Sequence, residues 1–119
     1  MLPNLVSMTF VLGDPIDAAT LGDDILLSVL PTEGKLVYFS AVPLEDDTGL
    51  TVDIDDDGTA VVTAVAAADK DAVSTWSTTH FGGTNEPVVF AKGSELGVDL
   101  NAMAAGNFIV LTFWFLLGA

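Results

Sequence analysis

The chain has no cysteine and no arginine, and its only basic residues are three lysines and one histidine in 119 residues. The absence of cysteine excludes disulfides, thiolate nucleophiles and cysteine-ligated metal centres. The absence of arginine removes the bidentate guanidinium that binds phosphate groups. The 17 acidic residues give a net charge of −14, which repels nucleic acids and anionic lipids. We therefore expect neither a nucleic acid nor a membrane as partner.

Long hydrophobic runs are also scarce. The longest run, residues 108–117, has about half of the ~20 apolar residues that a membrane-spanning helix needs. The first twelve residues have neither the basic start nor the small-residue cleavage site of a secretory signal. We therefore expect a soluble protein.

What the chain does contain is a series of short segments with apolar residues at every second position, separated by Gly, Pro and Asp. This pattern predicts an all-β protein, with residues 1–119 forming one antiparallel β-sandwich of the jelly-roll type and residues 1–5 a candidate extended arm. Residues 66–72 are expected to form a loop. The expected strands are 6–12, 25–29, 36–42, 50–54, 59–65, 73–79, 88–91, 95–100 and 107–117.

In the third expected strand, simple alternation places Leu36, Tyr38, Ser40 and Val42 on one face. The opposite face then carries Val37, Phe39 and Ala41.

The last expected strand is apolar on both faces. One face carries Ile109, Leu111, Phe113, Phe115 and Leu117, and the other carries Phe108, Val110, Thr112, Trp114 and Leu116. A sandwich strand normally buries one face and exposes the other to water. We therefore expect a subunit interface at Phe108, Val110, Trp114 and Leu116. In the alternative, residues 1–11 or 66–72 fold over this stripe within one chain.

One segment resembles half of a calcium-binding loop. Asp53, Asp55 and Asp57, followed by Gly58, match the first acidic positions of an EF-hand, but Ala64 stands where the closing bidentate Glu is needed. A hairpin with Asp57 and Gly58 in its turn is the favoured interpretation. We expect no metal and no cofactor, with these three aspartates as the one weak candidate for a calcium site.

No pattern of catalytic residues is recognisable. His80 is the only histidine, and although Ser74 and Ser77 are close in sequence, no nucleophile-elbow motif accompanies them. Acidic pairs such as Asp23-Asp24 are too numerous for any one of them to indicate a glycosidase. We therefore expect a protein that is not an enzyme.

From Gly49 onwards the order of features resembles a known family. Thr51-Val52-Asp53-Ile54 leads into Asp57-Gly58-Thr59, and residues 91–100 (AKGSELGVDL) precede a small-residue connection and a hydrophobic last strand. This resembles the small jelly-roll decoration (cement) and head-fibre proteins of tailed viruses such as bacteriophages. The chain departs from them in its extreme Asp content and its doubly apolar last strand.

The resemblance implies a structural protein without catalytic residues. Family members are typically homotrimers that bind the major capsid protein on the outer surface of the virion and stabilise its lattice. A carbohydrate-binding β-sandwich of a viral fibre or secreted enzyme is the alternative, with Trp76 as one candidate for stacking on a sugar.

The composition generates a first prediction. Purified protein will neither retard DNA at physiological salt nor turn over a panel of esters and glycosides, because phosphate-binding and catalytic groups are lacking. Gel retardation and chromogenic substrates check the two halves separately. A shifted DNA band would contradict the first half, and measurable turnover would contradict the second.

Overall fold

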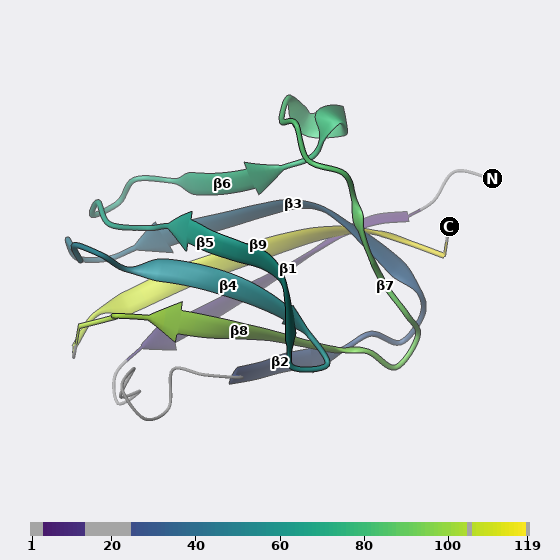
Figure 1. Ribbon diagram of the computed structural model, residues 1–119, viewed down its shortest axis with the longest axis horizontal. Coiled ribbons are helices and arrows are strands. Elements are labelled where there is room, and N and C mark those ends of the chain that lie inside the picture. The colour runs from purple at the N-terminus through teal and green to yellow at the C-terminus, as the bar shows by residue number, and fades with distance from the viewer. Residues whose placement is uncertain (1–3, 14–24, 105, 119) are drawn as a thin grey trace.

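Two antiparallel sheets packed face to face make up the computed structural model, which describes residues 4–13, 25–104 and 106–118 (Figure 1). Within these residues, the strands of the first sheet are β1 (Asn4–Gly13), β9 (Phe108–Leu117), β3 (Gly34–Pro43), β6 (Ser74–Ser77) and β7 (Val88–Phe90). Those of the second sheet are β2 (Ile25–Val29), β8 (Glu95–Asn101), β4 (Thr51–Asp56) and β5 (Thr59–Ala66).

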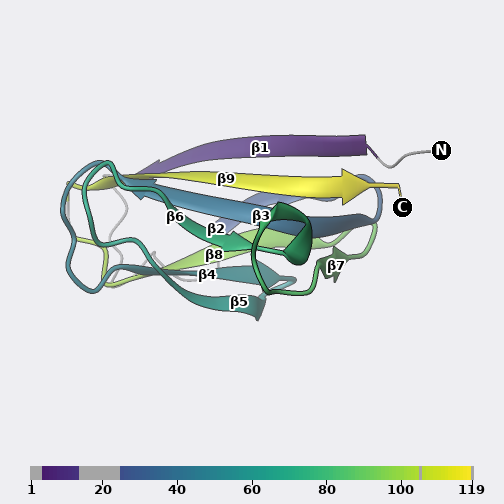
Figure 2. The ribbon, with the colours of Figure 1, turned by 90° about the horizontal axis from the view of Figure 1, so that it is seen from above.

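The strand order confirms the predicted class of fold. The first sheet runs β1-β9-β3-β6 and the second runs β2-β8-β4-β5, so most connections cross from one sheet to the other. Seen from above, the sheets are two stacked layers (Figure 2). Apart from the short β7, which pairs with the start of β3, these strands have the crossing order of the jelly-roll form of a β-sandwich. Asn4 and Leu5, which were expected in an extended arm, belong to β1; residues 1–3 lie outside the described residues.

The core lies between the sheets and depends on β9. Ile109, Leu111, Phe113 and Phe115 are fully buried, as their alternation predicts. The Phe113 ring lies 4.9 Å from that of Phe39, and the Phe115 ring meets Phe90 edge to face at 5.5 Å. The second sheet adds Val52, Ile54, Leu96, Val98 and Leu100.

The predicted faces of β3 are wrong at its start because of a β-bulge. The pairing of β3 with β9 shifts register between Leu36 and Tyr38. Leu36 is consequently buried in the core together with Phe39 and Ala41, whereas Tyr38 is only half-buried. A bulge adds one residue to one strand, and simple alternation cannot anticipate it.

The strand expected over residues 73–79 is also shorter than predicted. β6 ends at Ser77, and the chain leaves the sheet through the 3₁₀ helix η1 (Thr79–Phe81), which projects beyond β6 (Figure 1). It returns as β7, which pairs with Gly34–Leu36 while β6 pairs with Tyr38–Ala41. β6 and β7 therefore form one interrupted edge along β3.

The β4–β5 hairpin has the predicted turn. Asp57 and Gly58 both have positive φ, 51° and 82°, as a two-residue turn between right-twisted strands requires. The backbone N–H of Asp57 also donates to the carbonyl of Glu95 at 3.0 Å, which attaches the hairpin tip to β8.

A buried polar pair closes one end of the sandwich. Asp47 and Asn107 are 5% and 3% exposed, and Asn107 Nδ2 donates to Asp47 Oδ2 at 2.9 Å. The same Asp47 oxygen accepts the Ala104 N–H, while Asn107 Oδ1 accepts the N–H groups of Glu45 and Phe108. This network joins the β3–β4 loop to the segment that enters β9.

Asn107→Ala will lower the free energy of unfolding by about 2 kcal/mol, because it leaves buried polar groups without partners. Thermal or urea denaturation followed by circular dichroism measures the change. Asn101→Ala is the matched control, since half-buried Asn101 makes one longer bond of 3.3 Å to Thr51. Equal losses in the two variants would contradict the role of the network.

Candidate functional site

The outer face of the first sheet is the surface that best qualifies as a functional site. Strand register brings side chains from neighbouring strands into rows across it. Leu5, Leu116, Lys35 and Val89 form one row, and Ser7, Trp114, Tyr38 and Ser77 form the next. Thr9, Thr112, Ser40 and Thr75 form a third, and Val11, Val110 and Val42 form a fourth. The face is thus a band of hydroxyl groups flanked by apolar and aromatic side chains.

This surface, called here the uncharged face, carries almost no charge. None of the five strands β1, β3, β6, β7 and β9 contains Asp or Glu, and Lys35 is their only charged residue. In a chain with 17 acidic residues, that leaves a whole sheet free of carboxylates.

The outer face of the second sheet is the opposite. Asp53, Asp55, Glu95 and Asp99 alternate along β4 and β8 with core residues, and Asp53 is directly opposite Asp99. Of these four, Asp55 is buried, at 1% exposed. Like charges in directly opposite positions are unfavourable. The two faces of the sandwich therefore differ sharply in charge.

The four predicted interface residues all lie on the uncharged face. Phe108 is 39% exposed, and Val110, Trp114 and Leu116 are half-buried between their neighbours on β1 and β3. Sequence reasoning missed the apolar residues that other strands add to the same face, chiefly Leu5, Val11, Tyr38, Val42 and Val89. Their place there follows from strand order, which the sequence pattern does not contain.

Neither proposed covering segment lies over this stripe in the described residues. Residues 4–11 lie beside β9 in the plane of the sheet. Of residues 66–72, which were predicted to form a loop, Ala66 is the last residue of β5 and residues 67–72 form the loop. This loop bonds elsewhere, since Ala67 N–H donates to the carbonyl of Leu50 and Asp71 N–H donates to the carbonyl of Pro43.

An aromatic row crosses the uncharged face. Trp114 pairs in register with Tyr38, and the Tyr38 ring lies 5.8 Å from the ring of Phe81 in η1. Phe81 is 43% exposed. By contrast Trp76, the candidate for sugar stacking, is opposite Phe39 and packs against the core.

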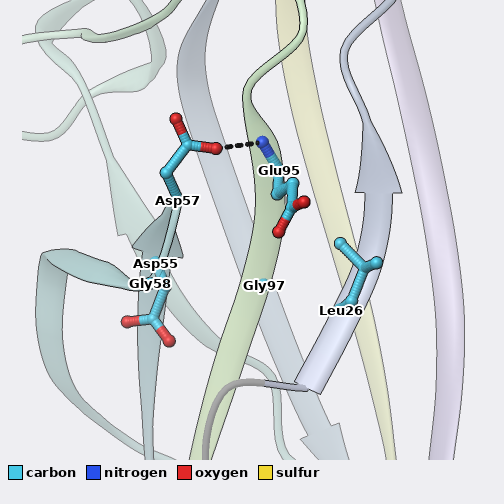
Figure 3. A pocket seen from close by; sticks show the side chains of 6 residues that line it. All are labelled: Leu26, Asp55, Asp57, Gly58, Glu95 and Gly97. Atoms are coloured by element: carbon cyan, nitrogen blue, oxygen red, sulfur yellow. Dashed lines mark hydrogen bonds between the residues drawn. The ribbon is translucent and has the colours of Figure 1, made fainter.

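A small pocket of ≈ 240 Å³ lies on the second sheet between β2, β4 and β8. Leu26, Asp55, Asp57, Gly58, Glu95 and Gly97 line it (Figure 3). The Asp57 carboxylate is turned toward Glu95 and accepts its backbone N–H at 2.8 Å, whereas the Asp55 carboxylate points the other way.

In the candidate calcium loop, Asp53 and Asp57 accept hydrogen bonds from different backbone N–H groups. Asp53 Oδ1 accepts the N–H of Ala64 at 2.7 Å, so the residue that replaces the closing Glu bonds to the first aspartate through its backbone. Ala64 itself has a φ of 57°. In the described residues, no three acidic or histidine side chains are grouped as metal ligands would be.

His80 lies in the exposed η1 segment, as expected for a loop residue. Ser77 is at the near end of β6 and Ser74 at the far end. Among the described residues, no helix has the length and apolar character needed to cross a bilayer.

Comparison with known proteins gives one informative likeness. No protein-family model matches the sequence, and no curated protein matches it. A chain of the Cyanophage Pam1 capsid asymmetric unit is similar in structure, with a TM-score of 0.58 and 15% sequence identity over 98% of this chain and 86% of that one. At this identity the likeness concerns the fold.

Calcium will produce no saturable heat at micromolar concentration in a calorimetric titration. The physical reason is that Asp53 and Asp57 already accept backbone N–H groups and Ala64 has no carboxylate. Asp55→Ala is the variant to compare. A saturable heat in the wild type that this variant abolishes would show that the loop binds calcium.

Proposed function

We propose that this chain is a structural protein of a virus particle, and more narrowly a decoration (cement) protein. In this role it binds the major capsid protein on the outer surface of the virion and stabilises the lattice. The observation that carries the proposal is the uncharged face, a carboxylate-free sheet on a chain of net charge −14. The likeness to a chain of the Cyanophage Pam1 capsid asymmetric unit supports it.

The distribution of charge suits this position. Glu95 on the second sheet and Asp57 at its hairpin tip are exposed to solvent, where like charge discourages particles from adhering to one another. A capsid exterior also requires no contact with the packaged nucleic acid, which a −14 chain would repel. The uncharged face remains for contacts with protein, where apolar burial stabilises association.

We further propose that the protein is a homotrimer whose copies meet through the uncharged face at Phe108, Val110, Trp114 and Leu116. A three-fold axis brings three copies of this stripe together. Leu5 and Val11, 45% and 61% exposed, extend the apolar area onto β1. Large contiguous apolar patches are uncommon on soluble monomers, which favours burial of this one.

The trimer contact predicts a mass of three copies of the 12.3 kDa monomer, or a multiple of three where a further contact joins trimers, measured by light scattering. Phe108→Asp and Trp114→Asp will each reduce the mass while β-sheet circular dichroism is kept, because they bury a charge in the contact. Leu26→Asp, at a 56% exposed apolar residue of the second sheet, is the control and will keep the wild-type mass. A wild-type monomer in which Trp114→Asp unfolds the chain would contradict the interface.

Electron microscopy of particles from the virus that encodes the chain tests the virion role directly. Particles made with the protein will carry extra density outside the capsid shell, and particles made without it will lack that density and disassemble at lower temperature. Absence of the protein from purified virions, measured by mass spectrometry, would contradict the proposal.

A carbohydrate-binding module is the second candidate, and the aromatic row of Trp114, Tyr38 and Phe81 favours it. Hydroxyl groups flank this row, and sugars bind to surfaces of this composition by stacking and hydrogen bonding. A glycan array distinguishes the candidates: specific binding that Tyr38→Ala abolishes would favour the module over the decoration protein.

A further inference from the structure

The four sheet edges of the sandwich are not equally regular. β2 has a register shift between Leu26 and Ser28, and β5 pairs with β4 through two shifts. The edge formed by β6 and β7 is interrupted by residues 78–87. β1, in contrast, pairs with β9 over ten successive residues without a shift. In the described part of the chain, no strand pairs with the other side of β1.

β1 also lacks the features by which proteins protect an edge. Bulges, prolines and charged residues usually prevent an edge strand from pairing with another chain. The segment Asn4–Gly13 contains no charged residue and no proline. Moreover, its core-facing residues Val6, Met8, Phe10 and Leu12 are only half-buried. An added strand would cover them and satisfy the open backbone groups.

We propose that the edge of β1 pairs with β1 of a second copy of this chain, antiparallel about a two-fold axis at Met8. In this register Leu5 faces Val11 of the second copy, and Ser7 faces Thr9 of the second copy. On the core side, Val6 faces Phe10 of the second copy. These pairs match in kind, apolar with apolar and hydroxyl with hydroxyl, whereas at the end of the ladder Asn4 faces Leu12 of the second copy.

Charge restricts contact between two copies to this part of the molecule. Each copy has a net charge of −14, so two copies repel wherever their acidic surfaces approach. β1 and the uncharged face beside it avoid this repulsion. Antiparallel pairing of identical strands is isologous and closes on itself, and it joins two first sheets into one continuous sheet.

The edge contact is independent of the virion role and of the trimer contact. The two contacts between copies are distinguishable by mass. The edge contact alone gives a dimer, and together with the trimer contact it gives a hexamer. The trimer contact alone gives a trimer.

Light scattering over a concentration series is the first test. The proposal expects twice or six times the monomer mass of 12.3 kDa. A monomer or a trimer at all concentrations would overturn the proposed β1–β1 pairing. The edge of β1 would then be available to a strand of a different protein. A trimer would at the same time support the trimer contact, so the two proposals fail separately.

Charges introduced on β1 provide the second test. In Ser7→Lys/Thr9→Lys, each lysine is opposite another lysine across the axis, so the even-numbered assembly will be lost. Ser7→Glu/Thr9→Glu will behave in the same way, and a one-to-one mixture of the two variants will restore the even-numbered assembly. Thr75→Lys, exposed on β6 of the same face, is the control and keeps the wild-type mass. Folded double variants that keep the wild-type mass, or whose mixture does not reassemble, would overturn the proposal.

A disulfide tests the register, because the chain has no native cysteine. Met8→Cys places two cysteines at the axis and will form a covalent dimer on mild oxidation. In Ser7→Cys the two cysteines are offset by two residues along the strands, roughly 8 Å apart. That exceeds the Cα separation of about 7 Å that a disulfide spans, so this variant will not crosslink. Equal crosslinking of both variants, or of neither, would overturn the register.

Discussion

The burial of β9 is the constraint on which the rest of the structure depends. β9 lies between β1 and β3 in the first sheet, and its inner side chains Ile109, Leu111, Phe113 and Phe115 form the middle of the core. Because alternate residues of a strand point to opposite faces, the same strand places Val110, Trp114 and Leu116 on the outer surface. The core and the candidate interface are thus two sides of one segment, and both are apolar.

Segregation of charge between the sheets gives the molecule its functional character. Acidic side chains gather on the second sheet and in the loops, while the strands of the first sheet have none. Burial of a carboxylate in a protein interface is costly, so a surface without carboxylates is well suited to contacts between chains. The acidic surface limits where a second protein can approach. The first sheet, whose strands contain no acidic residue, is the surface left for contacts with protein.

Several aspartates accept hydrogen bonds from backbone N–H groups. Oxygens of Asp46, Asp47, Asp53 and Asp57 accept N–H groups of Lys70, Ala104, Ala64 and Glu95, at 2.7 to 2.9 Å. The short Asp side chain bonds readily to nearby backbone in turns and loops. These four aspartates are part of the excess of Asp over Glu, 13 against four, in this chain.

The sequence alone determined the class of fold, most strand positions, the Asp57-Gly58 turn and the two apolar faces of the last strand, because these depend on local alternation and turn chemistry. The tertiary structure decided the bulge at Leu36, the early end of β6 at Ser77 and the neighbours of β9. Pairing between strands distant in sequence sets those features. The uncharged face and the regular edge of β1 became visible only when strand order brought five acid-free segments into one sheet.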